Sequence, residues 1–337
     1  MSLQPTNAGL HIPVMLDEVL EGLALHDGGA YVDGTFGMGG YSRAILDAAQ
    51  TTLWAMDRDP DAIERGQPLE KEFTPRLTLL QGRFGEMANL LGNAGVYKVD
   101  GIVLDLGVSS PQIDEAERGF SFRFDGPLDM RMEKQGPSAA DVVNSMEESE
   151  LARLIKQLGE ERRARRVARA IVEARAEARI TRTAELADIV RRAVPQGKSK
   201  IDPATRTFMA LRLHVNAELD ELDAVLRAAE EVLAPGGRLV VVSFHSLEDR
   251  LVKRFLRERS GAQARGSRHL PEVTDENVVP LTFQVTDKRG ISASNEEVKN
   301  NPRSRSARLR WAERAGATSE ASVTLGENGK WSVSDRP

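Results

Sequence analysis

The sequence predicts an α/β protein with a mostly parallel sheet and an inserted helical domain, and three observations support this prediction. Short apolar runs alternate with helical patterns, which is typical of a parallel α/β fold. A glycine-rich loop follows the first predicted strand, 30–33. Residues 106–237 separate the fourth predicted strand, 101–105, from the fifth, 238–244. A crossover between parallel strands needs only about a dozen residues, so a gap of this length predicts an insertion.

The other elements follow in order along the chain. Two more strands are expected at 52–57 and 77–81. The insert is expected over 113–205, where a loop rich in Gly, Phe and Asp precedes segments with apolar residues at helical spacing. After a polar break, a helix is expected over 207–233. The predicted domains are a discontinuous sheet domain over 1–112 and 206–315, the helical insert over 113–205, and a flexible polar tail over 316–337.

The composition excludes several classes of function. None of the 337 residues is cysteine, which excludes Cys nucleophiles, thiolate metal sites and Cys-ligated iron–sulfur clusters. The five histidines are scattered without metal-ligand spacing, so no metal is expected. No secretory signal pattern and no bilayer-spanning apolar run is present, so we expect a cytoplasmic protein with no membrane partner.

The net charge of −5 is distributed unevenly. Local basic patches can attract a polyanion even on an acidic protein, because screening makes the local field more important than the total charge. The alternative is that these arginines and lysines only form solvated helix faces. The basic segments are 162–169, 250–259 and 303–310.

The loop over 33–42 has the features of a cofactor site. Its glycines, Gly37, Gly39 and Gly40, let the backbone approach a ligand closely. Dinucleotide-binding folds have a similar loop, but Asp33 would repel a pyrophosphate and attract the ammonium of a methionine moiety. Asp57, at the end of the second strand, can accept hydrogen bonds from ribose hydroxyls. These two acids favour S-adenosylmethionine over a nicotinamide cofactor.

Two further residues are expected near the same ligand. Asp105 ends the fourth strand. Ligands of open α/β sheets bind beyond the carboxyl ends of the strands, so Asp33, Asp57 and Asp105 should meet in one crevice. Phe84 follows the third strand and could lie against an adenine, although a phenylalanine is more often part of the core.

Longer motifs resemble those of the bacterial RsmH family, formerly called MraW. The resemblance covers about residues 11–313, and the run Phe-His-Ser-Leu-Glu-Asp-Arg is much more specific than a glycine loop. The resemblance implies a class I methyltransferase that transfers a methyl group from S-adenosylmethionine to N4 of a cytidine in 16S ribosomal RNA, at the decoding centre of the small ribosomal subunit. The matching segments are 34–42, 57–60, 105–112, 117–122, 126–132, 244–250 and 301–306.

The resemblance also implies which residues contact the cofactor. Tyr41 departs from the family pattern, since many relatives have histidine there. Without the resemblance, DNA or protein amines remain alternative substrates, and a nucleic-acid-binding regulator with a structural cofactor remains an alternative class. A homodimer is left open. The implied contacts to S-adenosylmethionine are Gly39, Gly40, Tyr41, Asp57, Phe84, Asp105 and Gln112.

Methylation of a cytosine amine needs a group that accepts the amine's proton, because the nitrogen lone pair is delocalised into the ring. The candidates are Asp105 and Asp129, with His245 as a proton relay. Each has a simpler alternative. Asp105 could bind only cofactor, Asp129 could pair only with Arg131, and His245 could hydrogen-bond only a backbone carbonyl.

Contacts to RNA phosphates are expected from two basic segments, a helix over 162–169 and a strand over 303–310. Phe120, Phe122 and Phe124 alternate, which predicts either a stacking surface for a flipped base or one half-buried strand. The predicted phosphate contacts are Arg162, Arg163, Arg166, Arg169, Arg303 and Arg305.

Overall fold

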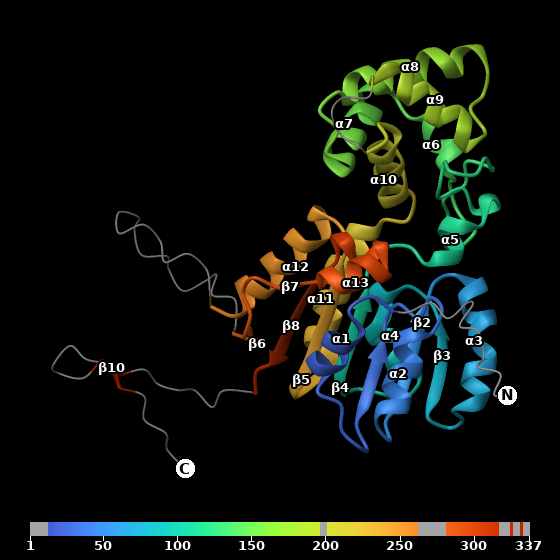
Figure 1. The fold of residues 1–337 in the computed structure, drawn as a ribbon. Coiled ribbons are helices and arrows are strands. Elements are labelled where there is room, and N and C mark those ends of the chain that lie inside the picture. Colours follow the sequence, from blue (N-terminus) through green and yellow to red (C-terminus); the bar gives the residue numbers. More distant parts are fainter. Residues whose placement is uncertain (1–12, 196–200, 262–280, 317–323, 326–330, 333–337) are drawn as a thin grey trace.

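The protein consists of a helix-covered sheet with a separate group of helices beyond the carboxyl ends of its strands (Figure 1). A computed structural model describes residues 13–195, 201–261, 281–316, 324–325 and 331–332. The strands of the main sheet are β1 (Ala30–Asp33), β2 (Thr52–Asp57), β3 (Leu77–Gln81), β4 (Val99–Asp105), β5 (Leu233–Ser243), β6 (Phe283–Gln284), β7 (Ile291–Ser292) and β8 (Arg308–Arg314). A second, two-stranded sheet pairs β9 (Thr324–Leu325) with β10 (Trp331–Ser332).

The main sheet has the strand order β3-β2-β1-β4-β5-β8-β6, with β7 also paired to β8. Strands β1 to β5 run parallel, and β8 pairs antiparallel with β5. The five strands expected at 30–33, 52–57, 77–81, 101–105 and 238–244 are present, and the mixed but mostly parallel α/β fold is confirmed. The order reverses between β1 and β4, which is where open α/β sheets bind their ligands.

Both faces of the sheet are covered, because successive side chains of each strand point to opposite sides. Val103 packs on one face with helices α1 (Leu16–Leu23) and α2 (Gly40–Ala48). Leu104 packs on the other face with α4 (Met87–Asn93), α11 (Glu218–Val232) and α12 (Ser246–Arg259). The edge beside β3 is flanked by α3 (Pro60–Glu72). Both apolar clusters bury the central strands and fix the positions of their carboxyl ends.

The insert forms a hydrophobic cluster of its own. Its helices are α6 (Ala139–Ser145), α7 (Glu148–Gly159), α8 (Ala164–Glu177) and α9 (Thr183–Ala193), and α10 (Ala204–Val215) joins them through Phe208 and Leu211. Helix α5 (Ser110–Asp114) leads from the sheet into a linker over 115–138. The linker begins with the short helix η2 (Ala116–Arg118) and ends at the first helix of the insert. Since α10 packs with the insert and α11 with the sheet, we propose that the insert extends to Val215 rather than ending at 205.

The helix expected over 207–233 is in fact two helices. It is broken between α10 and α11, where Ala217 has a left-handed backbone (φ 49°). The side chain of Asn216 bonds to the backbone of the linker there, donating to the carbonyl of Met130 and accepting from the amide of Met132. The sequence pattern could not show this break, because both helices remain amphipathic and the cause lies in the linker.

The strand expected over 303–310 is also different. Residues Pro302–Ser306 form a short 3-10 helix, η4, and the strand β8 begins at Arg308. Pro302 suits the first position of a helix because its missing N–H needs no partner there. The remaining short elements are η1 (Phe84–Glu86) and α13 (Asn295–Asn300). Most of the tail predicted over 316–337 lies outside the described residues.

Candidate functional site

A crevice of about 380 Å³ lies at the carboxyl ends of β1, β2 and β4, a size typical of small-molecule sites. Its walls come from the sheet loops, from the end of β5, from α10 and from η4. They therefore belong to both the sheet domain and the insert. The lining residues include Pro13, Val14, Gly37, Gly40, Tyr41, Asp57, Arg58, Phe84, Asp105, Val108, Gln112, Met132, Arg212, Phe244 and Arg303.

The glycine loop approaches the crevice closely. Gly37 and Gly39 have left-handed backbones, with φ of 53° and 73°, which other residues adopt at a cost. Gly40 begins α2, and a Cβ placed there would lie 2.5 Å from Cγ of Pro13. Only glycine therefore fits beneath Pro13. Gly37 and Gly40 line the crevice, whereas Gly39, which was also predicted to contact the cofactor, is not among its lining residues.

Asp57 combines a structural role with a position on the crevice wall. Its Oδ2 accepts a hydrogen bond from the amide of Gly37 at 2.8 Å, and its Oδ1 accepts one from the amide of Asp59 at 2.8 Å. Burial raises the pKa of Asp57 to about 6. Phe84 lies across the crevice at the start of η1 and also packs against the core. Phe84 is therefore part of the core, as the simpler reading expected, and its contact to an adenine stays a prediction.

Asp105 has the most unusual environment. Its backbone amide donates to Oγ1 of Thr35 at 2.7 Å, which fixes the end of β4. Its carboxylate lines the crevice, and Oδ1 is buried without a hydrogen-bond partner among the described residues. Burial, then the charges of Asp33 and Glu248, raise the pKa of Asp105 well above its ordinary value. A residue that lines a cavity and carries an unsatisfied carboxylate oxygen fits a ligand that brings donors and positive charge.

Asp33 has a different role from the one expected. Its side chain is fully buried beneath the loop and is not on the crevice wall. It accepts hydrogen bonds from Oγ of Ser42 at 2.7 Å and from the amide of Thr35 at 3.1 Å. Burial raises its pKa to about 6. The carboxylate therefore holds the glycine loop in shape, and the contact to a methionine ammonium predicted from the charge argument is not supported.

Two of the three proton-acceptor candidates lie away from the crevice wall. Asp129 is paired with Arg131, whose Nη2 lies 2.6 Å from its Oδ2. Burial raises the pKa of Asp129, but its hydrogen bonds from Arg131 outweigh that effect and lower it. His245 caps α12: its Nδ1 accepts from the amide of Glu248 at 3.4 Å, and its Nε2 lies 3.0 Å from Oε1 of Glu248. Asp129 thus follows its simpler alternative. His245 contacts Glu248, and not the backbone carbonyl that its simpler alternative named.

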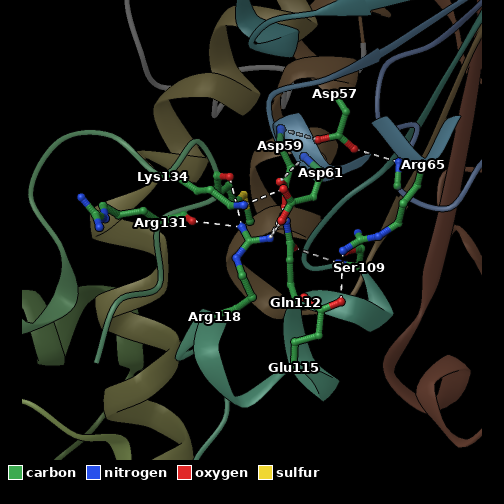
Figure 2. A network of polar contacts seen from close by, with 12 residues as sticks. Asp57, Asp59, Asp61, Arg65, Ser109, Gln112, Glu115, Arg118, Arg131 and Lys134 are labelled. Carbon is green, nitrogen blue, oxygen red and sulfur yellow. Dashed lines mark hydrogen bonds and ion pairs between the residues drawn. The ribbon is translucent and has the colours of Figure 1, made fainter. Parts of the chain in front are cut away.

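Tyr41 and Gln112 line the crevice with their polar ends already engaged. The hydroxyl of Tyr41 donates to the carbonyl of Val14. The amide of Gln112 accepts from the backbone of Ser109 at 3.0 Å and donates to Oδ2 of Asp59 at 2.8 Å. Figure 2 shows Gln112 pointing into this polar network. Their side chains thus shape the wall, and Gln112 links the α5 loop to the segment after β2.

Several lining residues were missed by the sequence analysis. Arg212 lies on α10 and forms a bidentate ion pair with Glu218, at 2.8 and 2.9 Å. Met132 belongs to the linker, and Val14 precedes α1. No local pattern marks these residues, because the fold brings them to the crevice from distant segments. Phe244 could have been found, since it directly follows β5 within the most specific motif.

The arginines predicted to contact RNA fall in two places. Arg303 lines the crevice, where Nη1 donates to Oγ of Ser110 and Nη2 lies 3.1 Å from both carboxylate oxygens of Asp114. The others lie on the surface. Arg166 and Arg169 share a second hollow of about 590 Å³ with Arg192 of α9 and with Glu173, whose Oε1 lies 2.7 Å from Nε of Arg169. All six predicted arginines are exposed: Arg162, Arg163, Arg166, Arg169, Arg303 and Arg305.

The three alternating phenylalanines do not form one surface. Phe120 is buried, and Phe122 packs edge-on against Phe208 of α10 with ring centres 4.9 Å apart. Phe124 is 59% exposed. Packing accounts for the first two residues, and only Phe124 has a face available for stacking.

The described helices include none that is long and apolar enough to cross a membrane.

The parallel sheet, the glycine loop after β1 and the acids that end β2 and β4 define a methyltransferase of the S-adenosylmethionine-dependent class. The chain belongs to the MraW methylase family, whose model matches residues 8–315. The fold class and family predicted from the sequence are thereby confirmed, and S-adenosylmethionine is the cofactor.

Relatives of similar length support the assignment. The chain is 55% identical to "Ribosomal RNA small subunit methyltransferase H" of Paramagnetospirillum magneticum, over 96% of this chain and 100% of that protein. It is 58% identical to the protein of the same name from Rhodospirillum centenum, over 91% of this chain and 93% of that one. The Rhizorhabdus wittichii protein of this name is 57% identical, over 93% and 95%.

Proposed function

We propose that this enzyme methylates N4 of a cytidine in 16S ribosomal RNA, at the decoding centre of the small ribosomal subunit. The names of the relatives, which match this chain over nearly their full length, support small-subunit ribosomal RNA as the substrate. The choice of N4 and of the decoding centre rests on the family resemblance. The structural observation that supports amine chemistry is Asp105, which lines the crevice and has one buried carboxylate oxygen without a hydrogen-bond partner among the described residues.

The residues that would hold the cofactor all line the crevice. S-adenosylmethionine supplies an electrophilic methyl group on its sulfonium. Asp57 lies where ribose hydroxyls can donate to it, and Phe84 offers a ring face to the adenine. Gly37 and Gly40 leave room for the backbone to approach the ligand. Enclosure between the loop and the linker excludes water and aligns the reactants, which provides much of the acceleration in such a transfer.

Asp105 is the proposed acceptor of the amine's proton. Its raised pKa suits this role, because a base with a pKa nearer the working pH retains the proton better. A hydrogen bond from the amine to the carboxylate of Asp105 would also localise the nitrogen lone pair. Of the three candidates predicted from the sequence, Asp105 is the one on the crevice wall, and Asp129 and His245 are not proposed.

RNA is proposed to reach the crevice along the insert. Arg166 and Arg169 line the basic hollow on α8, and Arg303 lies at the crevice itself. Exposed arginines bind phosphates and position RNA without reading its sequence. Arg162, Arg163 and Arg305 are exposed nearby in sequence and are proposed to extend this contact. We further propose that the enzyme acts in the cytoplasm, where ribosomal subunits are assembled, and the homodimer stays a prediction.

The test uses small ribosomal subunits from cells that lack this gene, incubated with the purified protein and methyl-labelled S-adenosylmethionine. Nucleoside mass spectrometry should then find the label in N4-methylcytidine or its derivatives. D105N serves as the matched variant and should incorporate far less label. Label in another nucleoside would refute N4 as the acceptor. Label in DNA or protein but in no ribosomal nucleoside would refute the RNA substrate.

A further inference from the structure

A buried arginine joins the cofactor segment to the linker of the insert. Arg118 ends the short helix η2, and 8% of its side chain is exposed. Figure 2 shows its guanidinium directed between the loop that carries Asp59 and the linker that carries Arg131. A buried guanidinium is costly unless its donors are satisfied. The identity of these partners therefore shows what the residue holds together.

The partners of Arg118 lie on two sides. On the cofactor side, Nη1 donates to Oδ2 of Asp59 at 2.8 Å and to Oδ2 of Asp61 at 3.2 Å. On the linker side, Nη2 donates to the carbonyls of Arg131 and Met132, each at 3.1 Å. The guanidinium is planar and rigid, so it fixes the distance between the two sides as a lysine could not.

Each side continues directly to the crevice wall. The amide of Asp59 donates to Oδ1 of Asp57, and Oδ2 of Asp59 also accepts from Gln112. Asp57 and Gln112 both line the crevice, whereas Asp59 is 1% exposed behind them. On the other side, Met132 is itself a lining residue. One side chain therefore ties together two segments that both contribute lining residues to the crevice.

We propose that Arg118 is a positioning residue that couples occupation of the crevice by S-adenosylmethionine to the placement of the linker and insert. The inference rests on the assignment of the crevice to S-adenosylmethionine and does not depend on which nucleotide is methylated. When the cofactor contacts Asp57 and Gln112, the loop that carries Asp59 becomes more rigid. Arg118 passes this loss of mobility to the carbonyls of Arg131 and Met132. The linker, which would form the wall beside the target base, then becomes ordered.

The chain offers a matched control. Lys134 lies on the same linker, and its Nζ pairs with Oδ1 of Asp61 at 2.5 Å, so it connects the same two segments. Its side chain is 49% exposed, and Asp61 does not line the crevice. K134Q therefore removes one linker ion pair and leaves the contacts between Arg118 and Asp59 in place.

The experiment compares the full-length wild type, R118M, R118K and K134Q. Isothermal titration calorimetry gives the Kd of S-adenosylmethionine, and amide hydrogen exchange of residues 118–134 is followed with and without the cofactor. We expect R118M to raise the Kd at least tenfold and to lose the cofactor-dependent slowing of exchange. R118K should recover part of the affinity through its charge, and K134Q should stay within twofold of the wild type with the slowing intact.

A fourth variant guards against misfolding of R118M. D59N keeps an oxygen to cap α3, where Oδ1 now accepts from the amide of Asp61, but it removes the charge that Arg118 and Gln112 share. It should reproduce the loss of affinity and of coupled exchange. The proposal is overturned if R118M and D59N bind the cofactor as K134Q does, or if cofactor still slows linker exchange in both. Because no RNA is present, this outcome is separate from a failure of the proposed substrate.

Discussion

Replacement of Asp105 by asparagine should change stability and cofactor binding in opposite directions. In the free protein, Asp105 holds a buried carboxylate oxygen with no hydrogen-bond partner among the described residues, and neighbouring Asp33 and Glu248 add negative charge. D105N removes the buried charge while nearly keeping the side-chain volume. An unsatisfied buried neutral group costs about 1–3 kcal/mol and a charged one costs more, so the neutral amide is the less costly side chain at this position. We therefore expect the free variant to be the more stable of the two.

The pH dependence provides a second measure of the same effect. Burial raises the pKa of Asp105 in the folded state, so the folded protein binds this proton more tightly than the unfolded chain does. The resulting stabilisation is complete below the unfolded pKa and is lost as pH rises through the folded pKa. D105N should remove that loss. Its advantage over the wild type should thus be absent in acid and grow towards neutral pH.

Binding should respond in the opposite sense. A hydrogen bond to a charged group contributes about 1.5–3 kcal/mol, which corresponds to a roughly 10- to 150-fold increase in the Kd of S-adenosylmethionine. Thermal unfolding at several pH values and calorimetric titration of the cofactor measure the two effects. The reasoning is refuted if D105N is less stable than the wild type at neutral pH, or if its cofactor affinity falls less than threefold.

Three further predictions follow from the crevice and the insert. G40A should lower the free energy of unfolding by about 1–3 kcal/mol, because its Cβ would lie 2.5 Å from Cγ of Pro13 and overpacking of this kind has that cost; an unchanged urea unfolding midpoint would contradict the close approach of Gly40 to Pro13. The double variant R166Q/R169Q should bind small-subunit RNA more weakly and reduce the salt slope of log K by about 2, with cofactor affinity unchanged; an unaltered slope in filter-binding assays would remove these arginines from the interface. Burial raises the pKa of Asp57 to about 6, so its stabilising contribution is present below about pH 4 and lost through pH 6, by up to about 3 kcal/mol. D57N should flatten this part of the stability curve in urea unfolding, and an unchanged curve would show that Asp57 titrates normally.

Much of the fold could be predicted from the sequence because its signals are local. Each buried parallel strand is a short apolar run, and the acids at 57 and 105 directly follow such runs. The carboxyl ends of parallel strands meet at one edge, so the position of Asp57 and Asp105 in one crevice followed from their place in the chain. The length between the fourth and fifth strands was enough to predict the insert.

The predicted roles of Asp33 and Asp129 are not supported by the structure, because the role of each side chain depends on which group it pairs with. Asp33 follows a strand just as Asp57 does, yet its carboxylate turns beneath the loop towards Ser42. Asp129 is held by Arg131 and lies away from the crevice. Residue type and spacing could not separate these acids, because burial and pairing depend on the direction of each side chain.

The sequence by itself determined the sheet, the cofactor loop, the insert and the family of this protein. Only the tertiary structure decided which acid faces the crevice, where α10 packs, and that Arg118 and Arg212 reach the site. The physical reason is that strands and loops are specified by neighbouring residues. The walls of the crevice are formed instead by contacts across more than fifty residues of chain, such as those of Arg118 with Asp59 and of Asn216 with Met132.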